Sequence, residues 1–173
     1  GAGADSGTFD YFTEAIVGKA KAIRTDYQPT EDDNVTIKGV AGDTYAMGFL
    51  GHAYYEENKD KVKAVAIDHG KGCVLPSRET VLDGTYQPLS RPLFIYVNVK
   101  SLDRPEVQAF VDFYLSPAAR RAIRSTGYVE LPSEAYRIGQ ELVKRRKAGT
   151  FFMELPAGTP LSKFIQELDK ELR

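Results

Sequence analysis

Asp5-Ser-Gly-Thr-Phe-Asp-Tyr-Phe12 is the stretch on which the interpretation of this 173-residue sequence depends. From Thr8 to Ala22 apolar residues recur every three or four positions, which predicts an amphipathic helix. The first turn of a helix has unpaired backbone N–H groups and a partial positive charge, so it attracts anions. The sequence therefore places a candidate oxyanion site at the start of this helix.

The residues before the helix suit such a site. Gly7 lets the backbone approach a ligand closely, and Ser6 and Thr8 carry hydroxyl donors. Asp5 can accept a hydrogen bond from a protonated oxyanion or orient a neighbouring cation. A Ser or Thr at this place is also the commonest type of helix N-cap, so plain capping stays open as the alternative.

Further along, apolar and β-branched stretches predict strands at 45–50, 62–68 and 92–99. After Asp103 the pattern becomes mostly helical. Mixed elements followed by helices indicate an α/β fold, with an organisational boundary at Tyr86–Pro92.

Composition excludes several classes of function. Lys plus Arg number 23 and Asp plus Glu 24. The sequence therefore lacks the excess of basic residues that is typical of nucleic-acid-binding proteins. No apolar run approaches the roughly 20 residues that span a bilayer. The N-terminal residues of this chain lack the pattern of a signal peptide, and its single cysteine excludes an intramolecular disulfide. Composition therefore does not decide the localisation.

Catalytic and metal sites find little support. Ser6 with His52 or His69 is a conceivable hydrolase arrangement, but the sequence has no G-x-S-x-G elbow. No His/Cys cluster has metal-ligand spacing, and no cofactor is predicted. We therefore expect a binding protein and not an enzyme.

Runs of like charge have simple structural explanations. The neighbouring carboxylates at 32–33 and 56–57 are typical of solvated faces and not of an acid–base pair. The basic run at 144–147 ends a predicted helix, where the dipole favours cations. A partner surface at this run is a secondary interpretation.

Several segments, in order along nearly the whole chain, resemble the phosphate-binding subunit of bacterial phosphate ABC transporters. The resemblance concerns its C-terminal half. The segments are Asp5–Phe12, Gly39–Asp43, Gly51–Asn58, Tyr86–Val97, Phe110–Leu115 and Gly127–Val129.

The resemblance implies part of a two-lobe periplasmic-binding-protein fold of type II, with a mixed sheet flanked by helices and a helical C-terminal region. Residues 1–91 would belong to a phosphate-binding lobe. Residues 92–173 would form the return crossing strand and helices that pack on the other lobe. Ser6, Gly7 and Thr8 would bind phosphate, with Asp5 in a supporting role.

The same resemblance implies the biological context. The protein would bind inorganic phosphate, without catalysis, for delivery to an ABC transporter permease. It would work in the periplasm or at the cell surface. The alternative is a fragment or paralogue of this fold that has lost ligand binding and acts as an interaction or sensory module.

Two departures from the family bear on these expectations. The family usually has an arginine four residues before the motif serine, where this chain has Ala2. The family's N-terminal half, with its own ligand residues and strands, is not in this sequence. The predicted strands are too few to cover the helices, so we expect no well-packed monomer. Instead, the chain would pair with the complementary half or with a second copy of itself.

Overall fold

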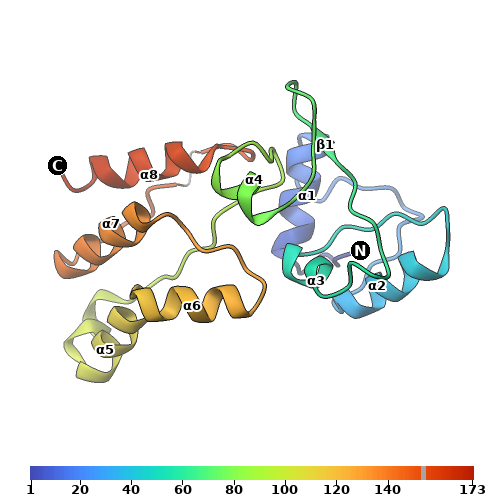
Figure 1. Ribbon diagram of the computed structural model, residues 1–173. Helices are drawn as coiled ribbons and strands as arrows, with labels where there is room; N and C mark the ends of the chain where they lie inside the picture. The colour runs from blue at the N-terminus through green and yellow to red at the C-terminus, as the bar shows by residue number, and fades with distance from the viewer. Residues whose placement is uncertain (153–154) are drawn as a thin grey trace. The chain divides into compact units, whose positions relative to one another are not determined.

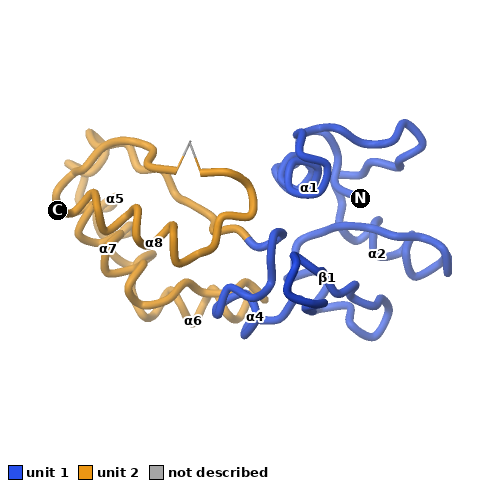
Figure 2. The backbone as a smooth tube through the Cα atoms, turned by 90° about the horizontal axis from the view of Figure 1, so that it is seen from above, with its two compact units in different colours: residues 1–90 blue, residues 91–173 orange. Residues whose placement is uncertain are grey.

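The computed structural model describes residues 1–152 and 155–173, and the chain divides into two compact units, residues 1–90 and 91–173 (Figure 2). The boundary falls between Ser90 and Arg91. No helix among the described residues is long and apolar enough to cross a membrane.

Unit 1 combines short helices with one small hairpin (Figure 1). Strands β1 and β2 are antiparallel, with Ile67 opposite Val74 and Asp68 opposite Cys73. The elements are α1 (Gly7–Val17), α2 (Asp33–Gly42), α3 (His52–Glu56), β1 (Ile67–Asp68), β2 (Cys73–Val74) and α4 (Arg78–Leu82).

Helix α1 confirms the predicted start of an amphipathic helix but ends earlier than the pattern indicated. Gly18 follows it in the left-handed conformation, with φ of 80°, and its N–H donates to the carbonyl of Glu14. Glycine adopts this conformation without the steric cost of a Cβ, so it ends the helix there. The predicted continuation to Ala22 is wrong for this reason.

An aromatic cluster holds α1 in unit 1. The rings of Phe12 and Phe49 stack with centroids 4.1 Å apart and an interplanar angle of 4°. Phe9, which is buried, and Tyr27 complete the cluster around Phe49. Ring pairs of this kind contribute about 0.5–1.5 kcal/mol beyond the burial of their area.

Unit 2 is helical throughout its regular elements. These are the 3₁₀ helix η1 (Val99–Asp103), α5 (Pro105–Tyr114), α6 (Pro117–Ser125), α7 (Ser133–Lys144) and α8 (Leu161–Lys170). Pro105 and Pro117 each occupy the first position of a helix, where the missing N–H costs no hydrogen bond. The buried hydrophobic residues of unit 2 are Leu102, Val111, Ala119, Ala135, Tyr136, Ile138 and Leu142.

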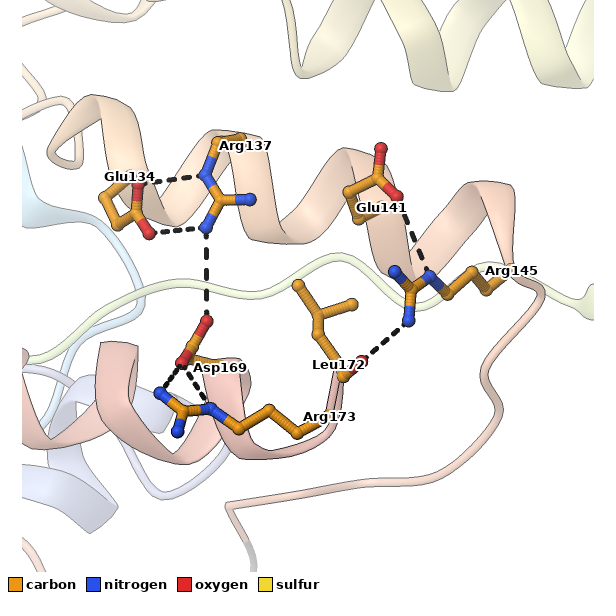
Figure 3. Close-up of polar contacts among 7 residues, drawn as sticks. All are labelled: Glu134, Arg137, Glu141, Arg145, Asp169, Leu172 and Arg173. Carbon is orange, nitrogen blue, oxygen red and sulfur yellow. Dashed lines mark hydrogen bonds and ion pairs between the residues drawn. The ribbon is translucent and has the colours of Figure 1, made fainter.

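The basic run after α7 makes contacts inside unit 2. Nη1 of Arg145 donates to the carbonyl oxygen of Leu172 at 2.7 Å, which ties α7 to the end of α8 (Figure 3). Nη1 of Arg146 lies 2.7 Å from the Asp103 carboxylate, and Nζ of Lys147 lies 3.3 Å from Glu171. These contacts give the run a structural role. A partner surface there stays an untested prediction.

A second set of ion pairs lies on the same two helices, and its Arg137–Asp169 pair links α7 to α8 (Figure 3). Arg137 donates to both carboxylate oxygens of Glu134, at 3.0 and 2.6 Å. Arg137 also lies 4.0 Å from Asp169 of α8, which in turn accepts from Arg173 at 2.8 Å. Exposed pairs contribute little individually.

The α/β class holds in a helix-rich form, but the predicted strands at 45–50 and 92–99 do not appear. Among the described residues only 67–68 and 73–74 form a sheet, so of the strand predicted at 62–68 only the last two residues are paired. Tyr45 is 96% exposed and Tyr96 76% exposed. A strand is stabilised by a paired neighbour, and the described residues provide none for these segments.

We predict that Ile138→Ala lowers the free energy of unfolding by about 2–5 kcal/mol, because Ile138 is completely buried in α7. Urea denaturation followed by circular dichroism measures the change. The control is Val35→Ala on the exposed face of α2, which should change stability by no more than about 0.5 kcal/mol. If Ile138→Ala were as stable as Val35→Ala, the burial of Ile138 in the packing of α7 would be contradicted.

Candidate anion-binding site

The start of α1 has the geometry of a capped helix. Ser6 has an extended backbone, and its Oγ accepts a hydrogen bond from the N–H of Thr8 at 3.2 Å. The Ser6 carbonyl accepts from the N–H of Phe9 at 3.0 Å. The capping alternative is therefore realised in this structure, and Ser6 fixes where the helix begins.

Capping leaves several donors unused. The Ser6 and Thr8 hydroxyl hydrogens and the Gly7 N–H have no hydrogen-bond acceptor among residues 1–152 and 155–173. Gly7 is exposed, while Ser6 and Thr8 are half-buried. These donors lie on consecutive residues at the positive end of a helix, which attracts anions.

The segment before the site is pinned to the loop that precedes α2. Ala2 forms a parallel bridge with Thr30, and the Tyr27 hydroxyl donates to the Ala2 carbonyl. Burial, followed by the negative charge of Glu31, raises the pKa of Tyr27 above its ordinary value. A Cβ at Gly3 would overlap the Glu31 carboxylate, so a larger residue there would make the Glu31 side chain move.

Ala2 stands where the family resemblance would place an arginine. Its side chain is only 4% exposed, and its carbonyl is held by Tyr27. The position is thus filled by a small, packed residue. In this structure no cationic side chain extends from it toward the start of α1.

Two carboxylates lie next to the candidate site in the sequence. Asp5 precedes the helix and is exposed, and Asp10 lies in its first turn. Oδ1 of Asp10 is buried without a hydrogen-bond partner in the described part of the chain, 4.0 Å from Nζ of Lys21. Negative charge at these positions disfavours a fully ionised anion and favours one that carries a proton to share.

The other candidates from the sequence are not brought to this site by any contact in the structure. Nε2 of His52 lies 3.3 Å from Glu56 one turn along α3. His69 is exposed in the turn between β1 and β2. Within the described residues, no group of three or more His, Cys, Asp or Glu side chains is placed to hold a metal ion.

Sequence reasoning did not assign a role to Tyr11. Its hydroxyl lies 2.8 Å from the carbonyl oxygen of Pro88 and 3.0 Å from that of Ser90. No local spacing could have revealed this contact, because the partners are far apart in the sequence. The only signal was the presence of Tyr11 in the same motif as Ser6.

Comparison with known proteins adds independent information. The family described as "PBP superfamily domain" matches residues 1–118. The Synechocystis "Protein SphX" is 51% identical over 93% of this chain and 49% of its own length. The Staphylococcus haemolyticus "Phosphate-binding protein PstS" is 38% identical over 76% of this chain and 40% of its own length.

A solved structure is also similar. It is described as a possible phosphate-binding protein from Planctomyces limnophilus, with 42% identity and a TM-score of 0.68. The match covers 85% of this chain and 52% of that protein. The chain thus spans about half the length of the relatives it matches.

The two hydroxyl residues should respond differently to substitution. Ser6→Ala removes the cap and is predicted to lower the free energy of unfolding by about 1 kcal/mol. Thr8→Val keeps the backbone N–H that donates to Ser6 and should change stability by less than about 0.5 kcal/mol. Thermal or urea unfolding measures both variants. A Ser6→Ala variant as stable as the wild type would show that the 3.2 Å capping bond adds nothing.

Proposed function

The chain belongs to the PBP superfamily, and from this membership we propose that it forms part of a phosphate receptor whose ligand contacts include Ser6, Gly7 and Thr8. The observation that carries the proposal is the set of unused donors on these consecutive residues at the start of α1. The Staphylococcus and Planctomyces relatives, which are named for phosphate binding, support phosphate as the ligand.

The proposed role is binding without chemistry. The relatives' names describe binding and no reaction, in agreement with the prediction that the chain is not an enzyme. Hydrogen bonds to an ionised oxyanion are shorter and stronger than neutral ones, so even a few donors contribute substantially to holding phosphate. The Asp5 carboxylate would accept a hydrogen bond from the hydroxyl of hydrogen phosphate, an interaction that sulfate cannot offer at neutral pH.

The wider context is proposed from the family. Residues 1–91 would contribute to a phosphate-binding lobe. Residues 92–173 would supply the return crossing and helices that pack on the other lobe of a two-lobe receptor. The receptor would deliver phosphate to an ABC transporter permease, in the periplasm or at the cell surface.

Completing the receptor would require more polypeptide than this sequence contains. The segments at 45–50 and 92–98 expose large apolar side chains and have no strand partner among the described residues. Pairing with the complementary half, or with a second copy of this chain, would cover them.

Light scattering coupled to gel filtration tests this association. We expect the isolated chain to run as a dimer or larger species, because water is a poor environment for the exposed apolar segments. Adding the N-terminal half of a phosphate-binding relative should convert it to a one-to-one complex. A monodisperse monomer that forms no complex with the added N-terminal half would contradict the proposed association.

Isothermal titration calorimetry tests the ligand. The chain should bind phosphate with a dissociation constant below about 1 mM and show no heat with sulfate. Thr8→Val should weaken phosphate binding by about 10- to 150-fold, since a hydrogen bond to a charged group contributes about 1.5–3 kcal/mol. Ser6→Asp should abolish binding, because aspartate still caps the helix but repels the anion.

The second candidate function is an interaction or sensory module of the same fold without ligand. The packed Ala2, in place of an arginine, is the observation that favours it. An absence of heat with both phosphate and sulfate, from a chain that unfolds cooperatively, would support this alternative and contradict the receptor proposal.

A further inference from the structure

Tyr11 connects α1, which begins at the candidate anion site, to the end of unit 1. It lies in α1, five residues after Ser6, which corresponds to a rise of about 7.5 Å along the helix. Its hydroxyl is shared between the carbonyl oxygens of Pro88 and Ser90, at 2.8 and 3.0 Å. A phenol carries a single O–H, so it donates to one of these carbonyls at a time or divides the bond between them.

The segment that Tyr11 contacts is the last part of unit 1. Gln87 and Pro88 are buried, and Ser90 is the residue after which unit 2 begins. Oε1 of Gln87 is buried and lacks a hydrogen-bond partner within the described residues. The Gln87 side chain therefore makes no hydrogen bond through this oxygen. The position of the segment depends more strongly on the hydrogen bonds that its backbone accepts from Tyr11.

Helix α1 is held firmly enough to move as one body. Phe12 stacks on Phe49, as described above, and Thr13 is almost fully buried. Oγ1 of Thr13 accepts a hydrogen bond from the N–H of Lys21 at 2.7 Å and donates back to the carbonyl of Phe9. A shift at the first turn therefore carries Tyr11 with it, since packed helices do not deform continuously.

We propose that Tyr11 is a positioning residue that couples occupancy of the anion site at Ser6–Thr8 to the placement of the Pro88–Ser90 segment, through which unit 1 continues into unit 2. The coupling rests on the proposed function for its ligand, inorganic phosphate. Its physical basis is that phosphate binds best to the position of α1 in which the donors of Ser6, Gly7 and Thr8 converge, and therefore stabilises that position. The hydrogen bonds of the Tyr11 hydroxyl then hold the two carbonyls in the matching position.

Carbonyl chemical shifts from triple-resonance NMR of the full chain test the coupling. The carbonyl carbons of Pro88 and Ser90 report directly on the hydrogen bonds that they accept. The amides of Gly7 and Thr8 report on phosphate at the site. The variant is Tyr11→Phe, and the matched control is Tyr45→Phe, whose phenol is almost fully exposed.

In the wild type and in Tyr45→Phe, titration with phosphate should shift the Gly7 and Thr8 amides together with the Pro88 and Ser90 carbonyls. In Tyr11→Phe, the chemical shifts of the two carbonyl carbons should differ from those of the wild type before phosphate is added. They should then lose their response to it, while Gly7 and Thr8 still respond. A residue with only a structural role would lower the melting temperature but leave the phosphate-induced carbonyl shifts in place.

The possible failures are distinguishable. If phosphate shifts Gly7 and Thr8 but not the carbonyls, or if Tyr11→Phe keeps the full carbonyl response, the coupling is overturned and the receptor proposal survives. If phosphate leaves Gly7 and Thr8 unchanged in the wild type, the receptor proposal fails and the coupling fails with it.

Discussion

Stacking of Phe12 on Phe49 is the interaction on which the rest of unit 1 depends, because it fixes α1. Once α1 is placed, its first turn presents Ser6, Gly7 and Thr8 at the surface, and Tyr11 meets the end of the unit. The candidate site is thus built on a rigid element and not on a loop. Sites on helices hold their donors more precisely than sites on flexible segments do.

The sequence predicted local features well and long-range ones poorly. A cap at Ser6 or Thr8 and the helical character after Asp103 follow from nearest-neighbour chemistry. In the structure Ser6 is the cap, and helices follow Asp103. The segment at 92–99 has strong strand preference but no partner within the described residues, so that preference alone did not make a strand. The contact of Tyr11 with Ser90 depends on tertiary packing, which no local pattern encodes.

Charge is used differently in the two units. In unit 2 the basic run is explained by internal contacts. Its cations bind residues in η1 and at the end of α8, through Arg145, Arg146 and Lys147. In unit 1 the start of α1 has carboxylates at Asp5 and Asp10 and no arginine at Ala2. Any anion held there would rely on backbone and hydroxyl dipoles, which tolerate salt better than long-range attraction between full charges does.

The unpaired segments around Tyr45 and Tyr96 have a consequence for handling the protein outside its biological setting. Both segments combine exposed aromatic and aliphatic side chains with strand preference, and neither is part of a sheet among the described residues. Such stretches are templates for intermolecular β-pairing, and their self-association grows steeply with concentration. The solubility of the isolated chain would therefore be limited by these two segments and not by its net charge.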